Sequence, residues 1–227
     1  KLIKDPNLEQ AIREEINKYD EELTEDDLLT LTKLDAQFKN IINLSGIELA
    51  KNIEILLLNY NEIEDITPLK YLSKIKSLDL SNNKINHLPG LDSLKNIVHL
   101  NLNYNQLKDI DSVILLSTLK YFSFIGNRVI NVSSLNYLIN IDTILADENN
   151  IENIPNISQL EKLKFLSLSY NKLSDINNLS SLKSLKYLSL DHNNIYDISS
   201  ISNLSTIEDI SLSANKLDGL DLVNLYN

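Results

Sequence analysis

Eight asparagines recur along the chain at a constant interval of 22 residues, with no insertion or deletion between them. A period of this length is typical of repeat architectures, in which each unit is one supersecondary element that cannot bury its apolar face alone. Neighbouring units must stack to bury a continuous core, so the spacing predicts a solenoid. The asparagines are Asn61, Asn83, Asn105, Asn127, Asn149, Asn171, Asn193 and Asn215.

Apolar residues within each unit follow two spacings. In the second unit, Leu78 and Leu80 are two residues apart, which is the period of a short strand that points both side chains to one face. From Ile85 to Ile97 the apolar residues recur at every third position, which fits a 3₁₀-like coil better than an α-helix. The pattern predicts an α/β leucine-rich repeat solenoid, with a parallel β-sheet on the concave face and 3₁₀ turns and coil on the convex side.

The recurring asparagines, called the asparagine ladder below, stand where each unit leaves its strand. An amide side chain carries two N–H donors and an acceptor, so it can pair with backbone groups of its own turn and of the neighbouring coil. Leaving such buried backbone groups unpaired would cost roughly 1–3 kcal/mol apiece. We therefore predict a structural role for the ladder and exclude it from any binding site.

A second polar column, called the turn column below, lies four residues after each ladder asparagine. Short polar side chains of this kind cap turns through nearby backbone groups. A metal site is the alternative interpretation, but the stack places the aspartates in separate units and interrupts them with amides and a glycine. Capping is therefore favoured. The column is Asp65, His87, Asp109, Asn131, Asn153, Asp175, Asp197 and Gly219.

Residues 1–33 do not follow the repeat and are predicted to form an N-terminal helical cap. Asp5 followed by Pro6 is typical of a helix start, and Thr24 with Asp27 resembles a capping box that opens a second helix. Residues 34–227 are assigned to the repeats: a degenerate first unit, then the 22-residue units, the last of them truncated. A truncated unit leaves its apolar face uncovered, so we expect the natural protein to continue past Asn227.

Charge and composition exclude several classes of partner. The formal net charge of −11 opposes binding to nucleic acid phosphates and to anionic membrane surfaces. No apolar run approaches the roughly 18 residues of a membrane-spanning helix. Cysteine is absent, which excludes disulfides and thiolate metal sites. We expect a monomer that binds no nucleic acid and does not insert into a membrane.

The sequence contains no recognisable catalytic, metal or cofactor motif. Of the three histidines, His99 and His192 lie four units apart, roughly 19 Å at the spacing of neighbouring strands, which is too far for a shared metal. The four glycines are scattered and form no phosphate-binding loop. We therefore predict that the protein is not an enzyme and holds no cofactor or metal.

Strand residues that point away from the core define the concave face. They form three columns, lying six, four and two positions before each ladder asparagine, which are called the first, second and third concave columns below. The repeat demands no apolar residue there, yet aromatic and aliphatic residues occur beside small serines, a composition typical of protein-binding surfaces. The predicted binding residues, three of them directly before the ladder, are Ile55, Leu57, His99, Tyr104, Tyr121, Ile125, Leu145, Phe165, Tyr170, Tyr187, Asp191 and His192.

Two further expectations concern this face. The alternative to binding is that its aromatic residues merely suit strand surfaces and shield one another. If the face does bind a protein, its aspartates predict a partner with basic residues at its rim. These aspartates are Asp79, Asp147, Asp191 and Asp209.

Three stretches of the chain resemble the internalins, bacterial surface proteins in which a helical cap precedes such repeats. They are DPNLEQAI at 5–12, LTKLDAQFKNIINLSGIELAKNIEILLLNYNEIEDITPL at 31–69, and the 22-residue units that follow. The resemblance spans the whole chain and implies an extracellular protein of a Gram-positive bacterium, secreted or held at the cell surface. It also implies binding of a host surface protein on the concave face, in adhesion and virulence, and an immunoglobulin-like domain after the repeats.

Another class of protein uses units of the same length. Intracellular phosphatase-regulating subunits also carry 22-residue leucine-rich repeats. An intracellular regulatory scaffold is therefore the alternative function.

Overall fold

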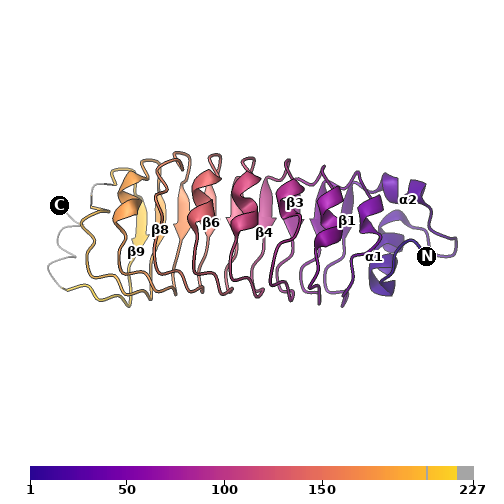
Figure 1. Ribbon diagram of the computed structural model, residues 1–227, viewed down its shortest axis with the longest axis horizontal. Helices are drawn as coiled ribbons and strands as arrows, with labels where there is room; N and C mark the ends of the chain where they lie inside the picture. The colour runs from indigo at the N-terminus through magenta and orange to yellow at the C-terminus, as the bar shows by residue number, and fades with distance from the viewer. Residues whose placement is uncertain (203, 219–227) are drawn as a thin grey trace.

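The units stack side by side into one elongated solenoid. The computed structural model describes residues 1–202 and 204–218, and within them nine short strands form one parallel sheet whose spatial order follows the chain. Figure 1 shows the strands along the long axis, with two helices at the N-terminal end. The predicted leucine-rich repeat fold is confirmed. The strands are β1 (Lys33–Asp35), β2 (Ile55–Leu57), β3 (Ser77–Asp79), β4 (His99–Asn101), β5 (Tyr121–Ser123), β6 (Thr143–Leu145), β7 (Phe165–Ser167), β8 (Tyr187–Ser189) and β9 (Asp209–Ser211).

Strand register repeats the sequence period. Leu56 pairs with Leu78, and Leu78 pairs in turn with Leu100, so equivalent residues of successive units lie next to one another. These three middle residues are fully buried in the core. Because side chains alternate across a strand, the residues on either side of each leucine face the concave surface. Each concave column is therefore a row of adjacent side chains running across the sheet.

The convex side carries short 3₁₀ turns. In five units the turn-column residue accepts a backbone N–H from two residues further on, as capping predicts: Asp65, Asp109, Asn131, Asp175 and Asp197. Gly219 of that column lies outside the described residues, as does the end of the last unit. The turns are η1 (Ile47–Leu49), η2 (Thr67–Tyr71), η3 (Leu91–Ser93), η4 (Asp111–Leu115), η5 (Ser133–Tyr137) and η6 (Asn177–Ser181).

Each ladder asparagine bonds to backbone groups of two units. The Asn127 amide donates to the carbonyls of Phe124 at 2.9 Å and Leu102 at 3.0 Å, and its oxygen accepts from the N–H of Leu107 at 3.0 Å. Phe124 belongs to its own unit, whereas Leu102 and Leu107 belong to the preceding one. The same bonds recur at Asn61, Asn83, Asn105, Asn149, Asn171, Asn193 and Asn215.

Two helices, α1 (Pro6–Ile16) and α2 (Glu25–Thr30), cover the N-terminal end of the core. Helix α1 packs against β1 and α2 against η1. The predicted helix starts are confirmed, because Asp5 caps α1 and Thr24 forms a capping box with Asp27 at the start of α2. Asp5 also reaches into the first unit, where its second oxygen accepts the N–H groups of Ile42 and Asn43. The cap is thereby bonded to the repeats as well as packed on them.

Candidate protein-binding face

The concave columns expose apolar side chains that the fold does not need in its core. Ile55 of β2 is 40% exposed and Phe165 of β7 is 38% exposed. Leu57, Ile125 and Leu145 are half-buried on the same face. These residues contribute apolar surface over the length of the sheet, as the sequence predicted from their position in the unit.

Aromatic residues of the first concave column stack in pairs on neighbouring strands. His99 and Tyr121 lie parallel, with ring centroids 4.1 Å apart and an interplanar angle of 2°. Phe165 and Tyr187 stack at 4.5 Å and 7°. Mutual shielding is therefore part of their arrangement, yet Tyr187 remains 36% exposed. Stacking fixes the orientation of each ring, so the exposed ring surface is already ordered before any partner arrives.

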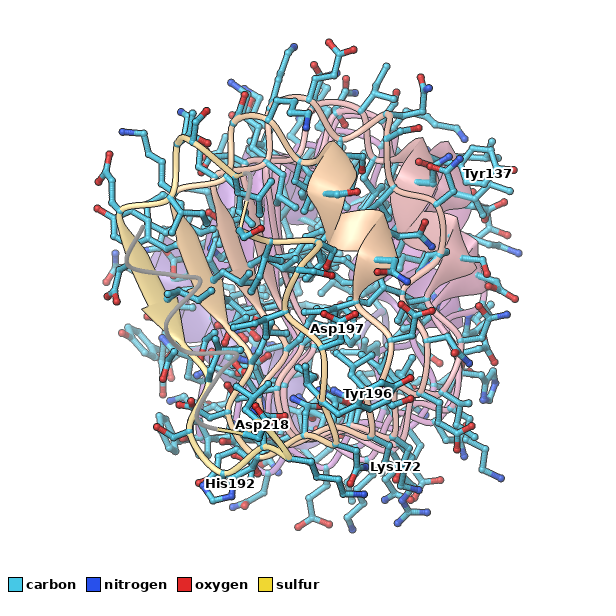
Figure 2. The ribbon with its side chains drawn as sticks, turned by 90° about the vertical axis from the view of Figure 1, so that its left-hand side faces the viewer. Tyr137, Lys172, His192, Tyr196, Asp197 and Asp218 are labelled. Carbon is cyan, nitrogen blue, oxygen red and sulfur yellow. The ribbon has the colours of Figure 1, made fainter. Side chains whose placement is uncertain are left out.

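Tyr104, Tyr170 and His192 lie on the rim of the face, not on its strands. They directly precede ladder asparagines, where the backbone is left-handed, with φ of 53°, 56° and 52° respectively. Figure 2 shows His192 below the ends of the strands. Tyr170 and His192 stack at 4.2 Å, and the Tyr104 ring lies over Gly126, where an added Cβ would come within 2.4 Å of a ring carbon.

Side-chain hydrogen bonds join the third concave column to the next strand. Asp191 accepts from the Ser211 hydroxyl and from the Ser213 N–H, both at 2.6 Å and both through the same oxygen. Asp147 and Asn103 make the equivalent pair of bonds to the strands that follow them. Asp191 was predicted as a binding residue, and one of its oxygens has a structural role of this kind.

A shallow hollow of about 220 Å³ opens over β6 to β9. The Phe165 and Tyr187 rings form its wall, with Leu145 at one end and Asp209 at the other. The structure thus brings three of the predicted binding residues together, and the hollow is also lined by the core leucines Leu166 and Leu188 and by four concave residues outside the predicted binding set. The run of serines at one position of successive units was the available signal for three of them. The added residues are Ser167, Ser189, Ser211 and Asp209.

Negative charge dominates the face. The concave columns of β2 to β9 contain four aspartates and no lysine or arginine. Burial lowers the pKa of His99 despite the opposing charge of Asp79. At the rim, burial raises the pKa of Tyr104, and the charges of Glu148 and Asp147 raise it further. The concave columns of β2 to β9 therefore carry net negative charge.

Within residues 1–202 and 204–218, no group of three or more His, Cys, Asp or Glu side chains is placed to hold a metal ion. No helix there has the length and apolar character needed to cross a membrane.

The stacked units, the single parallel sheet and the open concave face define a leucine-rich repeat protein. No protein-family model and no curated protein sequence matches the chain. Among solved structures, internalin C2 of Listeria monocytogenes is 31% identical with a TM-score of 0.89, the match covering 93% of this chain and 95% of that one. The chain belongs to the internalin family.

Two other structures extend this comparison. An internalin F of Listeria monocytogenes is 25% identical over 99% of this chain and 86% of its own, with a TM-score of 0.53. A leucine-rich repeat protein of Leptospira interrogans is 27% identical with a TM-score of 0.84, covering 89% of this chain and 54% of that one. The repeat geometry of this chain is therefore shared with proteins of more than one bacterial genus.

Proposed function

We propose that this chain is a non-catalytic recognition module that binds a protein ligand on its concave face, chiefly on the C-terminal half. The observation that carries the proposal is the exposed Phe165–Tyr187 stack beside Leu145, above a floor of serines. Rigid aromatic anchors next to small polar residues supply large contact area with little loss of side-chain entropy. Membership of a family of leucine-rich repeat proteins supports protein recognition over catalysis.

The shape of the face supports a macromolecular ligand. Nine strands at about 4.8 Å spacing give a surface roughly 38 Å long, which suits a protein domain. The hollow of about 220 Å³ is shallow, and it is smaller than the roughly 300–1,000 Å³ typical of small-molecule sites. We therefore assign the face to a folded protein or a protruding loop of one.

The family assignment also favours a location outside the bacterial cell. We propose a secreted or cell-surface protein of a Gram-positive bacterium whose ligand is a host surface protein, with a role in adhesion and virulence. The intracellular regulatory scaffold is the competing function, and no feature of the site favours it over the surface role.

Alanine variants on the concave face and on the convex side test this proposal. Phe165 and Tyr187 would be replaced together by alanine, and Tyr137→Ala would serve as the matched control. Tyr137 is 56% exposed and lies in η5, on the side opposite the sheet (Figure 2). Binding of fluorescently labelled protein to a panel of intact animal cells would be measured by flow cytometry, with thermal unfolding measured on each variant.

The concave double variant is expected to lose binding while its melting temperature stays close to that of the wild type, because neither ring lies in the core. Tyr137→Ala is expected to bind normally. Retained binding by a folded concave variant, or loss of binding by Tyr137→Ala alone, would place the ligand elsewhere.

A further inference from the structure

The hollow over β6 to β9 has an aromatic wall with one uncovered ring face. Phe165, Tyr187 and Asp209 are adjacent in the first concave column, on β7, β8 and β9. Because Phe165 stacks on one face of the Tyr187 ring, the other face is turned toward Asp209. An aspartate side chain is much shorter than a tyrosine, so the outer part of that ring face is open to a ligand.

A hydrogen bond at its hydroxyl also fixes the Tyr187 ring. Its hydroxyl donates to Glu208 at 3.0 Å, and Glu208 in turn pairs with Lys186 at 2.6 Å. The hydrogen bond to Glu208 and the charge of that residue raise the pKa of Tyr187, and Asp209 adds to the effect. The ring is therefore fixed in orientation, and at its hydroxyl the effect of Glu208 and Asp209 outweighs the opposing charge of Lys186.

Asp209 differs from the other aspartates of the concave columns. Asp79, Asp147 and Asp191 each accept a serine hydroxyl through one carboxylate oxygen. Within residues 1–202 and 204–218, the Asp209 carboxylate makes no hydrogen bond and no ion pair. No described residue therefore neutralises the charge of Asp209 beside Tyr187.

No lysine or arginine of the face competes for that charge. The concave columns of β2 to β9 contain neither residue type. At the adjoining edge of the sheet, Lys164 pairs with Asp142 at 3.0 Å and Lys186 pairs with Glu208. Among the described residues that line the hollow, none is a lysine or arginine, and Lys186, beside the Tyr187 hydroxyl, is already paired with Glu208.

We infer that this hollow receives an arginine side chain of the protein partner, whose guanidinium stacks on the open face of Tyr187 and pairs with the carboxylate of Asp209. A planar guanidinium can do both at once, whereas a lysine ammonium is a compact, strongly hydrated charge. The Ser189 and Ser211 hydroxyls on the floor offer further acceptors. The inference rests on the proposed function, because it names the chemistry of the ligand at that same face.

Selection of peptides tests the arginine directly. A displayed library of random cyclic peptides would be selected on the wild-type protein, and dissociation constants would be measured for the enriched peptides. The protein variants are Asp209→Asn, Tyr187→Leu and Phe165→Ala. The matched control for lost charge is Asp92→Asn, at an exposed aspartate of η3 on the convex side. Each arginine peptide would also be made with citrulline, which keeps the shape and removes the charge.

We expect enrichment of arginine and about tenfold weaker binding for Asp209→Asn, for Tyr187→Leu and for the citrulline peptide, with Asp92→Asn unchanged. Melting curves establish that each variant is folded. The inference would be overturned, and the proposed function left standing, by peptides that bind the concave face without arginine. Peptides whose dissociation constant is unchanged by Asp209→Asn would have the same consequence. Peptides that bind only other faces, indifferent to Tyr187→Leu and to Phe165→Ala, would contradict both.

Discussion

A ladder asparagine and the residue before it show how single positions hold two units together. The asparagine amide forms hydrogen bonds with buried backbone groups of both units. The preceding residue adopts a left-handed conformation in all eight units, although only Gly126 is glycine. A side chain in that conformation costs roughly 1–2 kcal/mol, which the surrounding hydrogen bonds must offset. The same turn directs Tyr104, Tyr170 and His192 to the rim.

Replacement of Asn127 by alanine tests the structural part of this description. It leaves the Leu102 and Phe124 carbonyls and the Leu107 N–H without their amide partner, so we expect a loss of about 2–4 kcal/mol in unfolding free energy. Asn140→Ala is the control, because the Asn140 side chain is only half-buried and bonds to Ser117 and Lys162. Its loss should stay below about 1 kcal/mol in urea denaturation. Equal losses would contradict the ladder's role.

His99 makes the fold sensitive to mild acid. Burial lowers its pKa, and its Nδ1 atom is buried without a hydrogen-bond partner. The unfolded chain therefore takes up the proton more readily than the folded one. This stabilisation is fully present above the unfolded pKa of about 6.5 and is lost as pH falls through the lower folded value.

The measurement is the melting temperature of wild type and His99→Gln between about pH 7.5 and 5, above the range in which carboxylates titrate. We expect the wild type to lose more stability over this interval than the variant. Parallel curves would show that His99 is not the group responsible.

Among the secondary-structure elements, the helical cap is fixed by one carboxylate. Asp5 accepts the N–H groups of Asn7 and Leu8 at the start of α1, and those of Ile42 and Asn43 in the first unit. Burial alone would raise the pKa of Asp5, but these backbone hydrogen bonds outweigh it and lower the pKa below its usual value. The stabilisation is therefore present above the unfolded pKa of about 3.9 and is lost as pH falls through the folded value.

Asp5→Ala is expected to loosen the cap and cost about 2–4 kcal/mol, through the lost helix N-cap and the unpaired N–H groups of the first unit. Hydrogen exchange resolved by residue would show faster exchange over α1 and little change over β6 to β8. Asp20→Ala, at an exposed position of the same cap, is the control. Uniformly faster exchange along the whole solenoid would contradict a local role for Asp5.

The extent to which the sequence predicted the structure depends on the kind of contact. Strand positions, concave columns and helix starts follow from a period of 22 residues and from local capping motifs, because each is fixed within one unit or by its exact repetition. The stacking of Phe165 on Tyr187 and the bonds of Asp191 to the next strand depend on side-chain rotamers in two units at once. The absence of a described hydrogen-bond or ion-pair partner for the Asp209 carboxylate can likewise be seen only when its neighbours are placed.

For the whole molecule, the constant period makes units interchangeable. In such a stack each unit contacts only its neighbours, so removal of one complete unit should keep the register of the others. Deletion of residues 62–83 would place Leu56 and Leu58 beside Leu100 and Leu102, with leucines still facing leucines. We expect a shorter but folded solenoid, seen by circular dichroism and small-angle scattering.

A second deletion, of residues 172–193, is expected to fold equally well but to lose ligand binding, because it removes Tyr187 and His192. Deletion of 62–83 should keep binding at the C-terminal half of the face. If both deletions bind equally, the ligand does not depend on this part of the solenoid. If neither folds, the units are not interchangeable.

Site-specific photo-crosslinking shows whether the concave face contacts the protein ligand. A photoreactive phenylalanine analogue would replace Leu145 on the concave face in one protein and Tyr137 on the convex side in another. Each protein would be irradiated on intact cells that bind the wild type. We predict a covalent adduct with one cell-surface protein from position 145 and none from position 137. An adduct from position 137, with none from position 145, would contradict it.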